Sequence, residues 1–506
     1  MLARVSRGFV RRVARLDPVV LATGLAAALP VIVSTIRAVK AGWLPLGDDA
    51  MIVVRALDVL STHSPLVGAH SASSSVIGAP VASPGPMLFW LLALPARLGH
   101  VAPAIAMGAV NTAAVVGMVA LARRRGGVVL MLVVAGALAL MCRSLEAQIY
   151  HDVWNPSAAV LPFALLVFLA WSVAAGEHAL LPLIVVVGSF AAQAQLAYAL
   201  PVLALFAVAL AFLVGSRVPV PRRTIVGALL ALLVCWSLPL AEEVVHRPGN
   251  LVRIGQVATS DVHKFGWGPG WHSVEHAVGV APWWLRPQRD GLERLADVGF
   301  APGALMTASA LALLAALVAA LALALRRGER DLAAGLALAL ALCAAVATVT
   351  ARSPTEHDLF STIGYTLWWA AVAGMFAWVV LGWAAIRLLR PRWRLEALRP
   401  ALMVAGVAAV AAIGVAVSAA ERPDPRHRNY RPVGRLLDRV RDAVPPGPAV
   451  RVEGPSPGQG LAAGPAVDVV AAIAYELRRG GVELVTDDVI GIGHRYDPGP
   501  HPYSRV

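Results

Sequence analysis

The sequence predicts an α-helical protein that crosses a membrane many times. Of its 506 residues, 58% are hydrophobic and only 14% are charged, whereas an average soluble chain is about 25% charged. Apolar stretches of about eighteen residues or more recur along the chain, and each is long enough to span a bilayer. Arginine clusters separate these stretches, as in cytoplasmic loops. The net charge of +13 therefore reports membrane orientation, and nucleic-acid binding is excluded.

We expect about eleven transmembrane helices, with the N-terminus cytoplasmic and the C-terminus outside the plasma membrane. With this count, the arginine clusters at the N-terminus and near residues 123, 217, 326 and 387 all fall inside, and one missed span would move every later cluster to the wrong side. The expected spans are residues 18–39, 102–122, 127–145, 157–175, 180–198, the stretch between Pro201 and Arg217, 224–241, 303–325, 332–350, 361–386 and 400–419.

The chain divides into a transmembrane domain, residues 1–420, and a small extracytoplasmic α/β domain, residues 421–506. In the tail, we predict a helix at 433–443, a strand at 449–453, a helix at 466–479 and a strand at 482–486. The predicted outer loops are 40–101, 146–156, 242–300 and 351–360. Within the first loop, the amphipathic stretch 50–60 is expected to lie on the membrane surface, and the short apolar helix 87–97 to be re-entrant or interfacial.

Two adjacent carboxylates, Asp48 and Asp49, stand just after the first span. Neighbouring like charges raise each other's pKa values, and a raised pKa suits a general base. A carboxylate here could also hold a metal ion or a sugar hydroxyl. The alternative is a solvated helix end or a helix cap.

A dense polar stretch, residues 143–156, follows the third span. Asp152 and His151 could bind sugar hydroxyls or assist proton transfer, and Arg143 could pair with a phosphate; an ordinary polar loop is the alternative. Arg352 is expected on a lipid-linked phosphate, or as an anchor beside the membrane. The other candidate substrate-binding residues are Gln148, Asn155, Gln195 and His357. No metal-ligand spacing is strong.

Four short motifs occur in an order that resembles the GT-C superfamily of membrane glycosyltransferases. They are Gly47-Asp48-Asp49-Ala50 after the first span, Ser83-Pro84-Gly85-Pro86 before an aromatic, apolar helix, the turn Ala122–Arg125, and Trp154-Asn155-Pro156. The resemblance includes the protein mannosyltransferase and aminoarabinose-transferase-like families, and a group of uncharacterised actinobacterial membrane proteins. The chain departs from the pattern at Ser83, where such enzymes commonly carry histidine.

The resemblance implies a transferase that uses a polyprenyl-phosphate-linked sugar as donor at the outer membrane face. Its acceptor would be a cell-envelope glycan, lipid or protein. Asp48 or Asp49, with Asp49 favoured, would take the proton of the acceptor hydroxyl. A divalent cation is left open. The alternatives are a transporter or flippase of a lipid-linked sugar, and a non-catalytic partner of an envelope glycosyltransferase. Polar residues gather at one face and are scarce within the spans, which favours the enzyme over a transporter.

Overall fold

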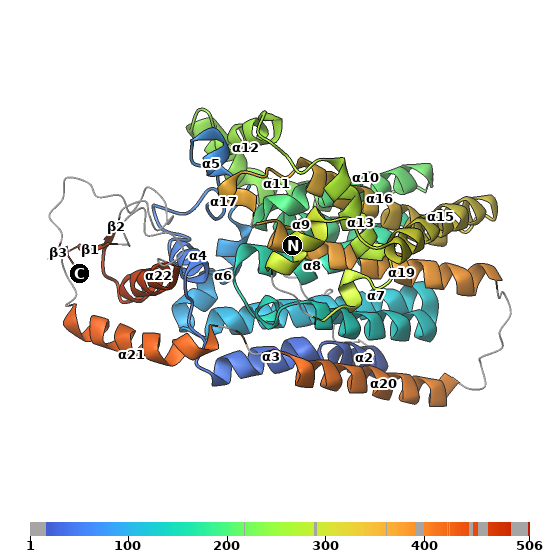
Figure 1. Cartoon of the computed structure of the whole chain (residues 1–506), viewed down its shortest axis with the longest axis horizontal. Coiled ribbons are helices and arrows are strands. Elements are labelled where there is room, and N and C mark those ends of the chain that lie inside the picture. Colours follow the sequence, from blue (N-terminus) through green and yellow to red (C-terminus); the bar gives the residue numbers. More distant parts are fainter. Residues whose placement is uncertain are drawn as a thin grey trace.

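A computed structural model shows a mostly helical molecule whose long helices run largely along one direction (Figure 1). It describes residues 17–505 except 217, 288–290, 361, 390–398, 423, 425, 445–448, 454–463 and 487–503. Eight of the described helices are long and apolar enough to cross a membrane, and a bent pair makes a possible ninth. The arginines of the N-terminal cluster and Arg217 lie outside the described residues, whereas Arg222 and Arg223 begin α11 (Arg222–Val245).

Most expected spans are single helices at the expected positions. The exceptions are the first, which bends by 59° between α2 (Pro18–Ala27) and α3 (Leu29–Lys40), and the fifth, α9 (Leu181–Ala194), which is short for a crossing. The bend lies at Pro30, which has no amide hydrogen to continue the helix. The remaining long helices are α8 (Asn155–Ala174), α10 (Ala199–Gly215), α11 (Arg222–Val245), α15 (Ala304–Arg326), α16 (Arg330–Arg352), α19 (Trp368–Leu389) and α20 (Arg399–Ala420).

The expected second and third spans form one element, α7 (Ala102–Met141), which is broken at Gly126 and Gly127. A straight helix of this length would measure about 60 Å, twice the thickness of the bilayer core. The amide of Asn111, in its first half, donates a hydrogen bond to the carbonyl of Tyr150, just beyond its second half, at 3.0 Å. The chain therefore turns back at the glycines, where Gly127 takes a φ of +65°. The total of eleven crossings stays a prediction.

Ion pairs gather several expected inner loops at one end of the bundle. Arg125, at the α7 turn, pairs with Glu177 after α8 and, at 3.0 Å, with Asp331 at the start of α16. Arg387, near the end of α19, pairs with Glu329 at 2.6 Å. These contacts place the turns after 125, 174, 326 and 387 together, as the arginine pattern predicts.

The opposite end holds the exits of the first and last spans. Arg37 of α3 donates hydrogen bonds to the carbonyl of Ser418 at 2.7 Å and to Glu421 at 2.9 Å. Because α3 and α20 lie side by side and end at the same level, the tail begins beside the first outer loop (Figure 1).

The first loop contains α4 (Asp48–Leu57), α5 (Ser74–Ile77) and α6 (Met87–Leu98). The stretch 50–60 was expected on the membrane surface, and this expectation is wrong. The apolar face of α4, with Ile52, Val53 and Val54 at most 2% exposed, packs between α6 and a helix of the tail. The apolar face of α4 therefore packs against a helix of the same chain that lies more than 400 residues later.

The tail contains α21 (His427–Ala443), β1 (Val450–Val452), α22 (Gly464–Arg479), β2 (Leu484–Thr486) and the short β3 (Ser504–Arg505). The four expected elements are confirmed, and the strands form a parallel sheet in the order β2-β1-β3. α22 shares a hydrophobic core with α4 and α6. Tyr475 donates a hydrogen bond to the carbonyl of Ala96 at 3.2 Å, and Arg478 pairs with Asp58 at 3.2 Å. The domain boundary at 420 stays a prediction.

Short helices fill the connections between the spans and carry several side chains of the site. They are α12 (Asn250–Thr259), α13 (Trp267–Val278), α14 (Gly291–Gly299), α17 (His357–Phe360), α18 (Ile363–Thr366), and the 3-10 turns Cys142–Ser144, Ala147–Tyr150, His178–Leu180, Leu196–Tyr198 and Trp283–Leu285.

Candidate active site

Two buried carboxyl groups meet where the first loop, the polar stretch after α7 and the tail come together. Asp49 lies in the first turn of α4, Asp152 lies just before α8, and each residue is only 2% exposed. The pKa of Asp49 is raised well above its ordinary value. Burial is the main cause, and the charge of Asp152 and a hydrogen bond with its side chain add to it, while Arg426 opposes them.

Two carboxylates can only accept hydrogen bonds, so Asp49 and Asp152 can bond to each other only when one of them carries a proton. The Oδ1 atoms of Asp49 and Asp152 are both buried, and as carboxylates they find no hydrogen-bond donor among the described residues. The raised pKa of Asp49 favours a proton on that group, and the protonated Asp49 can donate to Asp152. Such a pair can accept one further proton, as a general base does.

Arg426, from the segment that joins α20 to α21, binds this pair. Its Nη1 atom donates to Oδ2 of Asp49 at 2.9 Å. Burial works against the charge of Arg426, but Asp49, Asp152 and other carboxylates outweigh it and raise its pKa. The tail therefore supplies the cation that balances the buried carboxylates. Nothing in the sequence pattern singled out Arg426. The first and last expected spans both end on the same side of the membrane, however, so Arg426 was expected on the same side as Asp49.

Gly47 lets the tail approach the start of α4. Its φ is +53°, and an added Cβ would lie 2.2 Å from Oδ1 of Asp468 in α22. Its amide donates to the carbonyl of Asp468 at 3.2 Å. The glycine of the Gly-Asp-Asp motif is therefore needed for docking of the tail as well as for the turn.

An aromatic wall borders the carboxylates. Asp48, which is exposed, lies beside the side chain of Trp154, which favours the ionised form of this carboxyl group. The Trp154 ring packs edge-on against Tyr365 and Trp368, with ring centroids 4.7 and 5.7 Å apart. Carboxylates beside aromatic rings suit a ligand that carries both hydroxyl groups and apolar ring faces.

His151 stands beside Asp152 with one free ring nitrogen. Its Nδ1 atom lies 3.4 Å from the hydroxyl of Ser34 in α3, and its buried Nε2 atom has no partner among the described residues. Burial lowers its pKa, although Asp152 and Asp424 act in the opposite sense. The imidazole is therefore neutral at pH 7 and can bind a hydroxyl group.

The other predicted substrate-binding residues lie apart from this cluster or make local contacts. The amide of Asn155 donates to Gln195 at 2.8 Å and to the carbonyl of Ala194 at 3.1 Å, which ties α8 to the end of α9. Gln148 donates to Glu146 at 2.7 Å. Arg143 and Arg352 are exposed and have no side-chain partner among the described residues. The side chain of His357 lies outside the described part of the structure.

A buried arginine near the aromatic wall was not predicted. Arg294 of α14 is 5% exposed, stacks on the ring of Trp283 at 5.3 Å, and donates to the carbonyl of Gly364, next to Tyr365, at 3.4 Å. Burial lowers its pKa to about 10, so it stays charged at pH 7. Arg294 lies within a long, tryptophan-rich loop, and nothing in the sequence of that loop predicts that this arginine is buried.

Within the described ranges, no group of three or more His, Cys, Asp or Glu side chains is placed to hold a metal ion. No protein-family model matches the chain. No curated protein matches it either.

Proposed function

We propose that the protein is a membrane glycosyltransferase of the GT-C type, which moves a sugar from a polyprenyl-phosphate-linked donor to a cell-envelope acceptor. One observation carries the proposal: Asp49 and Asp152, from distant parts of the chain, form a buried carboxyl pair beside Arg426. Buried, strongly perturbed carboxyl groups are typical of sites that move protons.

In the proposed reaction, the carboxyl pair accepts the proton of the acceptor hydroxyl. The acceptor oxygen bonds to the anomeric carbon, and the bond from that carbon to the phosphate oxygen breaks. The phosphate leaves with the electron pair, so no acid is needed if cations hold it. A positioned base contributes about 10²- to 10⁴-fold to such a rate. The Trp154 wall would hold the sugar, and Arg294 is the buried cation that could face the phosphate.

The proposed orientation in the plasma membrane puts the carboxyl pair and the tail outside. The ion-paired turns at Arg125 and Arg387 would lie in the cytoplasm, in agreement with the positive-inside rule. With α7 counted as two crossings and α9 as one, the chain would cross the membrane eleven times. Labelling of single introduced cysteines at positions 177 and 439 with an impermeant reagent on intact cells tests this arrangement: position 439 should react and position 177 should not.

The decisive test is sugar transfer. Purified protein in lipid would be incubated with radiolabelled polyprenyl-phosphate sugars and a crude envelope acceptor. Asp49→Asn and Asp152→Asn should each lower transfer by about 10²- to 10⁴-fold, because the pair loses its base. Glu177→Gln is the matched control at the other end, and it should transfer at the wild-type rate.

Two outcomes would overturn the proposal. Donor movement across liposomes without any transfer would identify a transporter. Transfer that survives in both aspartate variants would remove the pair from the chemistry.

A further inference from the structure

A cavity of about 380 Å³ lies between the tail and the end of the first span. Its lining comes from residues 41–44 after α3, from His100 before α7, and from one flank of α21 and the buried Glu476 of α22. The volume falls in the range of small-molecule sites, about 300–1,000 Å³. Tyr430 forms the wall towards the carboxyl pair, since its ring lines the cavity and its hydroxyl donates to Asp424.

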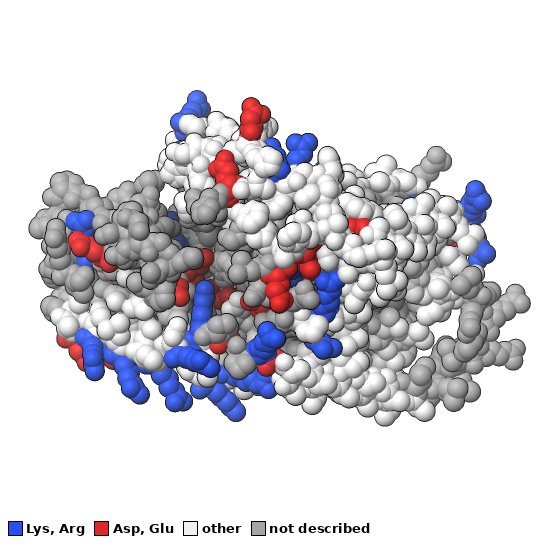
Figure 2. Space-filling view, in the orientation of Figure 1, with Lys and Arg blue, Asp and Glu red and all other residues white. Residues whose placement is uncertain are grey.

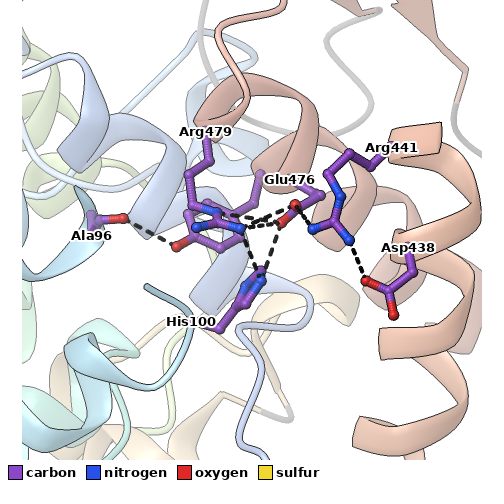
Figure 3. Close-up of polar contacts among 7 residues, drawn as sticks. Ala96, His100, Asp438, Arg441, Glu476 and Arg479 are labelled. Carbon is purple, nitrogen blue, oxygen red and sulfur yellow. Dashed lines mark hydrogen bonds and ion pairs between the residues drawn. The ribbon is translucent and has the colours of Figure 1, made fainter. Parts of the chain in front are cut away.

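The negative charges around the cavity are already balanced. Glu476 is bound by Arg441 at 3.2 Å and Arg479 at 3.1 Å, and Nε2 of His100 lies 3.3 Å from its carboxylate. Asp438 is bound by the same Arg441 at 2.6 Å. Figure 3 shows this network, in which Arg441 bridges the two carboxylates and Arg479 binds Glu476 as well.

Two arginines that line the cavity have no such partner. Arg431 and Arg435 lie one turn apart on the cavity flank of α21, both are exposed, and neither has an ion pair or a side-chain hydrogen bond within the described part of the chain. Gly434 stands between them, and an added Cβ there would meet only Leu44, at 3.6 Å. Both arginines therefore line the cavity without a carboxylate partner among the described residues.

The surroundings add to the positive charge. Figure 2 shows a row of Lys and Arg side chains along the edge of the molecule where α21 lies. Arg428, Arg431, Arg435 and Arg439 share that exposed face of the helix at spacings of three and four residues. Lys40, exposed at the end of α3, precedes Ala41 and Gly42 of the cavity lining.

We propose that this cavity binds a phosphate group between Arg431 and Arg435. Guanidinium groups bind phosphate oxygens with paired, charge-assisted hydrogen bonds. The cavity begins where the first span ends, so the phosphate can belong to a lipid headgroup or to a soluble phosphate compound. The site is separate from the carboxyl pair and does not depend on the proposed transferase activity.

Calorimetry on full-length protein in a neutral detergent tests the proposal with two probes. Inorganic phosphate represents the soluble source, and short-chain phosphatidic acid, compared with short-chain phosphatidylcholine, represents the lipid. We expect saturable binding of at least one probe. Binding of phosphatidic acid alone would name a lipid headgroup, and equal binding of both probes would name the phosphate itself.

The matched variants separate a site from general attraction. Arg431→Ala with Arg435→Ala should weaken binding at least about tenfold. Arg428→Ala with Arg439→Ala removes the same charge from the same exposed face, outside the cavity, and should weaken it less than about twofold. Equal losses in the two double variants, or no saturable binding of either probe, would overturn the proposal. Wild-type thermal unfolding in both double variants would show that the fold is intact.

Discussion

The two ends of the helical bundle differ in how their charged side chains are paired and buried. At the end with the turns of α7 and α16, Arg125 pairs with both Glu177 and Asp331 at partly exposed positions, and Arg387 pairs with Glu329. At the other end, Asp49 and Asp152 are buried side by side, and each has an oxygen atom without a donor among the described residues.

This difference separates structural charges from functional ones. Paired charges near a surface cost little and hold turns together. Buried like charges destabilise a fold, so they persist where chemistry needs them. The four predictions below test whether the carboxylate end behaves as a functional site and the ion-paired end as an anchor.

Among variants that keep both aspartates, the largest expected effect on transfer belongs to Arg426→Ala. Without this cation, the carboxyl pair holds its proton more tightly and loses the ionised form that acts as base. We expect sugar transfer to fall about 100-fold at pH 7, with the remaining rate rising at higher pH. The measurement is a pH–rate profile in lipid, in which Arg426→Lys should recover part of the rate. Arg387→Ala, at the other end, should keep the wild-type pH–rate profile. If Arg387→Ala lowered the rate as much as Arg426→Ala, the two ends would not differ in function.

Gly47→Ala should detach the tail from α4. The new Cβ would clash with Asp468, and the backbone at φ +53° disfavours any side chain. We expect the free energy of unfolding to fall by about 1–3 kcal/mol, with faster proteolysis after residue 420. The control is Gly382→Ala, at a position in α19 with no neighbour within 4 Å of the added Cβ. That variant should be neutral or slightly stabilised, and a stable Gly47→Ala protein would show that the tail tolerates another docking position.

Asp49→Asn should stabilise the protein while it removes activity. The raised pKa of Asp49 means that the folded state favours its protonated form. That contribution to stability is present below the ordinary pKa and is lost as the pH rises through the folded pKa. Asparagine stays neutral, so at pH 7 the variant should melt at a higher temperature than the wild type, and the difference should shrink on acidification.

Asp58→Asn is the contrasting variant for thermal melts in detergent. Asp58 is fully buried, but it pairs with Arg55 at 2.7 Å and with Arg478 at 3.2 Å. Its replacement should lower the melting temperature at pH 7, because both arginines lose a partner. If Asp49→Asn also melted at a lower temperature, Asp49 would be a structural ion-pair residue like Asp58.

The smallest effect is expected for Trp154→Phe. The variant keeps a ring in the aromatic wall but loses the indole N–H group, which favours the ionised form of the neighbouring Asp48. We expect KM for the sugar donor to rise about threefold, with kcat nearly unchanged. Trp171→Phe removes an indole hydrogen bond to the carbonyl of Asp331 at the other end, and it should leave both constants unchanged. A fall in kcat for Trp154→Phe would assign the indole to the reacting groups.

Local patterns predicted the helices and indicated Asp48, Asp49, His151 and Asp152 as candidate site residues. They could not predict contacts between distant segments. The length of each apolar stretch identified the spans. Because the third expected span ends on the same side as the first, the polar stretch after α7 was expected near the first loop. The cover of α4 by α22 was missed because an amphipathic helix has the same pattern against lipid and against protein. The bond between Arg426 and Asp49 joins residues 377 positions apart, and no periodicity reports such a pair. Asn155 and Gln195, both predicted to bind substrate, are hydrogen-bonded to each other, and their binding of substrate stays a prediction.

The side-by-side exits of α3 and α20 also have a consequence for biosynthesis. Asp49 emerges from the ribosome among the first residues, and Arg426 follows only after the last span has been made. Throughout translation, the nascent chain therefore carries its acidic pair without the arginine or the tail that will cover it. The buried cluster of Asp49, Asp152 and Arg426 is therefore completed in one late step. A truncation just after α20 should insert into the membrane normally and lack the proposed transferase activity.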